Sequence, residues 1–252
     1  MNRDADNSLS KVPQVTLGFW LIKILATTLG ETGGDAVSMS MNLGYVVGTA
    51  IFMGLFVLAV LLQIAAKRFH PFLYWATIIA STTVGTTLAD FVDRSLGIGY
   101  LGGTIILTTL LGASLLAWYR SLGAIDVGSV HTPSAEGFYW VTIMFSQTLG
   151  TALGDWTADS AGLGYTGAAL VFSGLLGVVA LAYGFSRISR TVLFWAAFVL
   201  TRPLGAVVGD FLDKPVASGG LAFSRYTATG LLLAAIALLI LLLPQRAAAR
   251  SH

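Results

Sequence analysis

Cysteine is absent from this chain of 252 residues, which excludes disulfides, thiolate metal sites and cysteine nucleophiles. Charged residues are scarce: they make up 10% of the sequence, whereas average globular domains carry about 25%. The net charge is only +2 and no basic stripe is present, so we expect no nucleic-acid partner. Hydrophobic residues make up 56%, which is more apolar surface than a soluble domain could cover with so few charges. We therefore expect an integral membrane protein.

Long uncharged stretches predict where the chain crosses the bilayer, because a helix of roughly 20 apolar residues spans the ~30 Å hydrocarbon core. Residues 36–66, 95–119 and 160–186 carry no charge at all. Together with stretches that are charged only near one end, they predict eight transmembrane helices at about 15–38, 44–66, 72–93, 99–119, 137–159, 164–185, 191–213 and 227–243. The expected fold is thus all-α and membrane-embedded, and we expect no enzymatic activity and no cofactor.

Lysine and arginine predict the orientation of these helices, because cytoplasmic loops carry an excess of both residues. Most of them fall on the side of the two termini, and Arg94, Lys214 and Arg225 fall on the other side. We therefore expect both termini to be cytoplasmic. No small-residue cleavage site follows the first apolar run, so we interpret it as a retained helix.

Four similar segments recur along the chain, which is typical of a repeat architecture. They read TTLGETGGD (27–35), TTVGTTLAD (82–90), QTLGTALGD (147–155) and RPLGAVVGD (202–210). A tryptophan precedes each segment at the same spacing: Trp20, Trp75, Trp140 and Trp195. A Gly-Tyr pair follows the first three segments at 44–45, 99–100 and 164–165. Each unit contains two predicted helices, so all four units should share one orientation about an axis along the membrane normal.

A second level of repetition shows that the chain is a doubled pair. Asp90-Phe91-Val92-Asp93-Arg94 matches Asp210-Phe211-Leu212-Asp213-Lys214. The repeats divide the chain as follows: cytoplasmic tail 1–13, repeat 1 at 14–68, repeat 2 at 69–119, cytoplasmic linker 120–136, repeat 3 at 137–188, repeat 4 at 189–244 and cytoplasmic tail 245–252.

Over about residues 12–245 the chain resembles a bacterial membrane-protein family built from four tandem repeats of unknown function, each with two transmembrane segments and a typical tryptophan. The four tryptophans of this chain match that residue. The resemblance implies the fold and the bacterial inner membrane, and implies no activity. The fourth repeat departs most, because Arg202-Pro203 stands where the other repeats have Thr-Thr or Gln-Thr and its Gly-Tyr pair is missing.

Acidic residues gather in the repeated segments, and this pattern carries the functional prediction. Eight of the twelve lie in these segments or within four residues after them: Glu31, Asp35, Asp90, Asp93, Asp155, Asp159, Asp210 and Asp213. A carboxylate at the centre of a membrane helix costs on the order of 2.5–3.5 kcal/mol on insertion scales, so intramembrane acids mark functional sites by default. The alternative interpretation is helix-end chemistry at the outer interface, which fits Asp93, Asp159 and Asp213 better than Asp35 or Asp90.

Carboxylates, hydroxyls and carbonyls together make a hard-oxygen site that suits Mg²⁺, Ca²⁺ or Mn²⁺. The first-choice ligands or proton carriers are Asp35, Asp90, Asp155 and Asp210, with Glu31 as an additional ligand. Secondary ligands are expected among Asp93, Asp159, Asp213, Thr86 and Thr151, because several share a helix face with a first-choice ligand. Lys23 and Arg202 fall inside predicted helices and should balance the charge.

The remaining motif residues have structural interpretations. Trp20, Trp75, Trp140 and Trp195 are expected mainly as interface anchors, with ligand contact as the alternative. The small pairs Gly30/Gly34, Gly85/Ala89, Gly150/Gly154 and Gly205/Gly209 are expected to let helix backbones approach closely. The helices that carry these motifs would then form an inner ring, and the more uniformly apolar helices would form an outer layer facing lipid.

The leading hypothesis is a secondary transporter of a small inorganic cation such as Mn²⁺, with export as one direction and protons as the coupling ion. A second hypothesis is a non-transport membrane scaffold whose acids stabilise helix ends. A third is a transporter of an anionic or organic solute that binds to Lys23 and Arg202.

Overall fold

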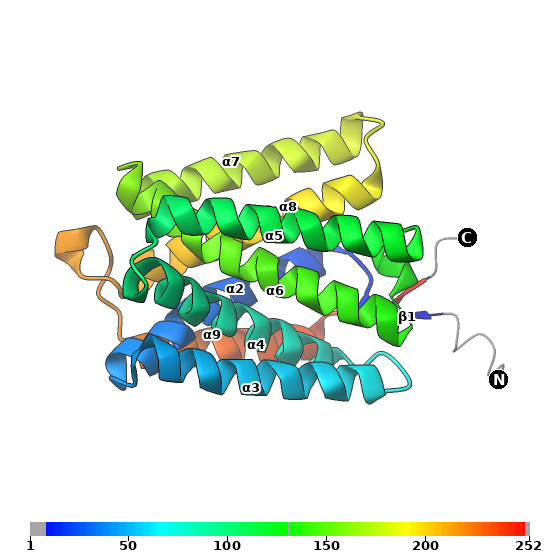
Figure 1. The fold of residues 1–252 in the computed structure, drawn as a ribbon, viewed down its shortest axis with the longest axis horizontal. Coiled ribbons are helices and arrows are strands. Elements are labelled where there is room, and N and C mark those ends of the chain that lie inside the picture. Colours follow the sequence, from blue (N-terminus) through cyan, green and yellow to red (C-terminus); the bar gives the residue numbers. More distant parts are fainter. Residues whose placement is uncertain (1–8, 131, 250–252) are drawn as a thin grey trace.

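The computed structural model describes residues 9–130 and 132–249. Within them the chain forms eight long helices that run along the longest axis of the molecule (Figure 1). Their bounds are α2 (Leu17–Asp35), α3 (Gly44–Ala65), α4 (Pro71–Asp90), α5 (Gly99–Leu122), α6 (Pro133–Asp155), α7 (Gly164–Phe185), α8 (Arg190–Asp213) and α9 (Arg225–Leu242). The all-helical prediction is confirmed. Six of these helices are long and apolar enough to cross a membrane, and α2 and α6 are not among them.

The helices form two layers. In the inner layer, α2 contacts α4 and α8, and α6 contacts the same two helices, so the four make a closed ring. Each outer helix packs on the inner helix that follows it: α3 on α4, α5 on α6, α7 on α8, and the last helix α9 on the first inner helix α2. The outer helices bury few residues and leave most of their apolar side chains exposed. This arrangement is typical of helices that face lipid.

Glycines allow the inner helices to approach closely, as small residues do in membrane bundles. A Cβ atom at the motif glycine of each inner helix would overlap a residue of the next helix in the ring. The pairs are Gly30 with Thr82, Gly85 with Gln147, Gly150 with Arg202, and Gly205 with Thr27. The four partners occupy the same position of the repeated segment, so one contact recurs four times around the ring.

Three of the four inner helices change their winding immediately after the motif aspartate. A π-helical turn follows in each case, at η1 (Ala36–Ser40), η2 (Phe91–Ser95) and η4 (Trp156–Ser160). The fourth helix, α8, stays α-helical through Asp213, and the short 3-10 turn η5 (Val216–Ser218) comes later. Such π-turns are rare and occur frequently at functional sites. We call this end of the bundle the acidic end.

The opposite end is closed by aromatic side chains, and we call it the aromatic end. Trp75, Trp140 and Trp195 are buried there, and they pack edge-to-face or tilted against neighbouring rings. The hydroxyls of Tyr74 and Tyr139 share a hydrogen bond of 2.7 Å between two inner helices. An interface anchor would expose its ring at the bilayer surface, whereas these three tryptophans are enclosed by other rings. Of the four motif tryptophans, Trp20 alone is partly exposed.

The segments at the two ends of the described chain, which belong to the predicted cytoplasmic tails, pair with each other across the aromatic end. Strand β1 (Leu9–Pro13) runs antiparallel to β2 (Ala247–Ala249). Lys11 of β1 forms a 2.7 Å ion pair with Glu136 of α6, which anchors the ribbon to the bundle. The predicted linker at 120–136 is also shorter than expected, because α5 continues to Leu122 and α6 begins at Pro133.

Candidate functional site

The four motif aspartates meet at the acidic end. Asp35, Asp90 and Asp155 are the last residues of α2, α4 and α6, and Asp210 lies in the last turn of α8. Because the four helices run in the same direction around a closed ring, their equivalent residues converge. All four carboxylates are buried, with at most 3% of each residue exposed. The structure therefore brings Asp35, Asp90, Asp155 and Asp210, the four first-choice residues of the sequence prediction, to the same end of the ring.

Arg94 binds two of these aspartates. Its Nε lies 2.9 Å from Asp90 Oδ1 on its own helix, and its Nη2 lies 3.2 Å from Asp155 Oδ2 on the next inner helix. The guanidinium also donates to the Tyr45 hydroxyl at 3.2 Å. We call Asp90, Asp155 and Arg94 the Arg94 cluster. It holds two acids and one base.

Lys214 stands at the equivalent position of the fourth repeat and binds the other two aspartates. Its Nζ lies 2.6 Å from Asp35 Oδ2 and 2.9 Å from Asp210 Oδ1. Arg225 adds a second base, with Nε 3.1 Å from Asp213 Oδ2 and 3.7 Å from Asp35 Oδ2. We call these five residues the Lys214 cluster. Burial by itself would lower the pKa of Lys214, but the carboxylates of Asp210 and Asp35 raise it above its ordinary value, so the ammonium stays charged.

The acids of the Lys214 cluster have the spacing of a metal site. Ligand oxygens of Asp35, Asp210 and Asp213 all lie within 4.8 Å of one another. Asp35 Oδ1 and Asp213 Oδ1 are buried and lack a hydrogen-bond partner within the described chain. Carboxylate oxygens of this kind suit Mg²⁺, Ca²⁺ or Mn²⁺. A cation that binds here must displace or share space with the Lys214 ammonium.

A second polar group lies inside the ring, one turn closer to the aromatic end. The guanidinium of Arg202 on α8 is fully buried and donates to Glu31 Oε2 on α2 at 3.0 and 3.1 Å. It also donates to Thr86 Oγ1 on α4 at 2.6 Å and to Thr151 Oγ1 on α6 at 2.5 Å. Arg202 thus connects all four inner helices. It fills the space that Gly150 leaves open.

The expected charge-balancing residues behave differently from each other. Arg202 balances Glu31, as described above. Lys23 is buried without a carboxylate within 4 Å in the described part of the chain. Its ammonium lies 4.1 Å from the centre of the Phe198 ring and 3.5 Å from Thr201 Oγ1. Neither residue balances the motif aspartates, whose partners are Arg94, Lys214 and Arg225.

The secondary ligands divide into three groups. Asp213 joins the Lys214 cluster, and Thr86 and Thr151 bind Arg202. Asp93 is buried against α5, where a Cβ atom at Gly103 would overlap its carboxylate, and both its oxygens lack a hydrogen-bond partner in residues 9–130 and 132–249. Asp159 is exposed. The structure therefore separates Asp93 and Asp159 from the clusters.

The three bases of the acidic end are the functional residues that sequence reasoning missed. Arg94, Lys214 and Arg225 were interpreted only as markers of membrane orientation. For two of them a signal was present: Arg94 and Lys214 each follow a motif aspartate by one helical turn, the spacing at which opposite charges pair. Nothing in the sequence pointed to Arg225, which reaches the cluster from α9.

No curated protein and no solved structure matches the chain. A family described as Repeat of Unknown Function (DUF347) matches four times in tandem, at residues 18–69, 73–123, 138–189 and 193–246. These matches cover nearly all of both helix layers and both clusters. The chain belongs to this family of four-fold repeats.

Proposed function

We propose that this protein is a secondary transporter of a small inorganic cation, most plausibly a divalent one such as Mn²⁺, and that the Lys214 cluster is its binding site. All eight long helices would span the bacterial inner membrane, with both termini cytoplasmic and the axis of the ring along the membrane normal. The amphipathic inner helices α2 and α6 would be shielded from lipid by α9 and α5, on which they pack. The proposed transport would be passive or coupled to an ion gradient.

The observation that carries this proposal is the oxygen geometry of the Lys214 cluster. Three carboxylates from two inner helices each place an oxygen within 4.8 Å of the other two. Two oxygens of these carboxylates are buried without a hydrogen-bond partner in the described residues. Buried acidic oxygens are costly unless they bind a cation or a proton. The Lys214 ammonium occupies this place as a tethered cation, and a transported ion would exchange with it.

Proton coupling is the second part of the proposal. The carboxylates of both clusters and Glu31 outnumber the bases Arg94, Lys214, Arg225 and Arg202 that pair with them. Excess carboxylates in a low-dielectric site take up protons when no other cation is bound. Binding of a divalent ion would then release protons, which gives antiport a physical basis.

The test is Mn²⁺ flux into proteoliposomes that contain the purified protein. We expect Asp210→Asn and Asp35→Asn each to lower the flux by about tenfold or more, because a ligand charge is lost while the side-chain shape is kept. The matched control is Asp159→Asn, an exposed aspartate at the same end, which should transport like wild type. An imposed pH gradient should change the rate. Normal flux in both cluster variants would refute the proposal.

The ion pairs also favour one alternative, a membrane scaffold that carries no ion and in which the two clusters serve to hold neighbouring helices together. Arg94 and Lys214 each connect neighbouring inner helices. The scaffold hypothesis predicts that the Asn variants lower the melting temperature of a protein that never carries ions. The anionic-solute hypothesis is weaker, because Arg202 is already occupied by Glu31.

A further inference from the structure

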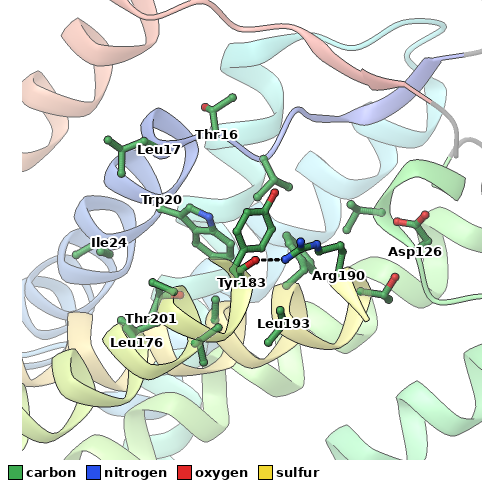
Figure 2. Close-up of a pocket in the computed structure, with 17 residues that line it drawn as sticks. Thr16, Leu17, Trp20, Ile24, Asp126, Leu176, Tyr183, Arg190, Leu193 and Thr201 are labelled. Atoms are coloured by element: carbon green, nitrogen blue, oxygen red, sulfur yellow. Dashed lines mark hydrogen bonds between the residues drawn. The ribbon is translucent and has the colours of Figure 1, made fainter. Parts of the chain in front are cut away.

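A groove opens on the side of the bundle near the aromatic end, far from both clusters. It lies between α2, α7 and α8, and its cavity volume is about 600 Å³. Figure 2 shows Trp20, Tyr183 and Leu193 on its walls, with Thr201 and Leu176 at its deeper end. This volume falls within the range of roughly 300–1,000 Å³ that is typical of ligand sites.

The groove exists because the outer helix of the third repeat, α7, turns a side chain outward where the outer helices of the first two repeats bury theirs. The equivalent outer-helix residues are Gln63 in α3, Trp118 in α5 and Tyr183 in α7. Gln63 and Trp118 are buried: Gln63 donates to the Lys11 carbonyl at 3.1 Å, and Trp118 packs edge-on against Trp195. Tyr183 is 59% exposed. Arg190 holds it there, donating to its backbone carbonyl and placing the guanidinium 4.1 Å from its ring centre (Figure 2).

The groove is polar at one end and apolar along its depth. Thr16, Arg190 and Thr191 lie toward the aromatic end, together with Asp126, whose carboxylate accepts from the Gly128 amide. Further along α2, α7 and α8 the lining is mostly aliphatic and aromatic. Such a site matches an amphiphile with a negative headgroup and a hydrocarbon chain.

We infer that this groove binds one anionic glycerophospholipid, with an acyl chain between α2 and α7 and the phosphate at Arg190. The chain would fill the space that Gln63 and Trp118 fill in the other repeats. The inference rests on the proposed placement of the helices in the bilayer, and it does not depend on transport. A negative headgroup fits the basic side of the protein, which the arginine distribution places at the cytoplasmic leaflet.

The experiment uses the purified full chain and phosphatidylglycerol, compared with phosphatidylcholine of the same acyl composition. Native mass spectrometry should count one retained phosphatidylglycerol, and this lipid should raise the melting temperature by roughly 3 °C or more beyond phosphatidylcholine. Arg190→Gln should abolish the difference between the two lipids. Ala180→Trp, which fills the groove from α7, should abolish the retained lipid.

Two matched controls keep the inference falsifiable. Arg187→Gln removes an exposed arginine that does not line the groove, and Val178→Trp adds a ring to the outward face of α7. Both should bind lipid like wild type. Three results would overturn the inference: equal stabilisation by the two lipids, a lipid count that Ala180→Trp and Arg190→Gln leave unchanged, or a dimer that buries the groove. If Ala180→Trp does not fold, Arg190→Gln decides alone.

Discussion

The Lys214 cluster and the Arg94 cluster come from a duplicated sequence but differ in geometry. Each contains two motif aspartates from neighbouring inner helices, bridged by a base one turn beyond an aspartate. Only the Lys214 cluster recruits a further acid, Asp213, and a further base, Arg225 from an outer helix. Within the described residues, only the acids of the Lys214 cluster have oxygens close enough to one another to bind one metal ion together.

Local winding explains the difference. After Asp90 the chain turns into a π-helix, so the angular position of Asp93 changes and its carboxylate packs against Gly103. After Asp210 the helix stays α-helical, and Asp213 points to Arg225. The first buried residue of α9 is Ala228, whereas α5 has Gly103 there, so a carboxylate has less room against α9. The winding after the motif aspartate and one methyl group on the outer helix therefore distinguish the two clusters.

The largest expected effect comes from Arg202, the residue that connects all four inner helices. Arg202→Met should destabilise the protein by about 3–5 kcal/mol, because it leaves the buried Glu31 carboxylate without its partner. The free energy of unfolding in mixed detergent measures this loss. Arg187→Met, at an exposed arginine, should change it by less than about 0.5 kcal/mol. Adding Glu31→Gln to Arg202→Met should restore most of the stability. A double variant as unstable as the single one would contradict the role of this ion pair.

The next effect distinguishes the two bridging bases. Lys214→Gln should tighten Mn²⁺ binding by about tenfold at pH 8, because the ion no longer competes with an ammonium that costs roughly 1.4 kcal/mol to displace. The gain should shrink at lower pH, since protons then replace the missing ammonium on the carboxylates. Arg94→Gln is the matched control and should leave the affinity nearly unchanged. Equal effects of the two substitutions in a calorimetric titration would remove the distinction between the clusters.

The third comparison concerns Asp213 and Asp93, the second aspartates of the duplicated motif, and includes the smallest expected change, that of Asp93→Asn. Asp213→Asn should cost about 1–3 kcal/mol, because Arg225 loses a charge-assisted hydrogen bond. Asp93→Asn should change the stability by less than about 1 kcal/mol, because no partner in the described residues loses a bond. Melting temperatures of the two variants compare them directly. A larger loss of stability for Asp93→Asn than for Asp213→Asn would contradict this account, because it would show that the Asp93 carboxylate makes a stabilising interaction.

Much of the fold was predictable because repeats constrain it. The spacing of tryptophan, glycine and aspartate indicated the inner helices, and the small residues indicated their close contacts, which the pairs Gly30–Thr82 and Gly205–Thr27 illustrate. The gathering of Asp35 and Asp210 also followed from equivalent positions. Sequence periodicity carried no signal for the π-turns, for the β1–β2 pairing or for the exposed Tyr183, because each depends on tertiary contacts.

The site was predicted by its acids and missed by its bases. Arginine and lysine near a helix end are typical signals of membrane orientation. The same residue types can pair with buried acids, as Arg94 and Lys214 do here. For the tryptophans, the sequence pattern alone did not distinguish an interface anchor from a ring packed inside the bundle. An interface belt and a closed aromatic layer both place tryptophan near a helix end, and only the packing of Trp75 and Trp140 against other rings distinguishes them.

The most direct test of the central claim is a Mn²⁺ binding isotherm followed by electron paramagnetic resonance on the purified protein. The account predicts one bound ion in wild type and in Asp155→Asn, and none in Asp210→Asn at the same concentration. An ion retained by Asp210→Asn, or lost equally from both variants, would contradict the assignment of the cation site to the Lys214 cluster.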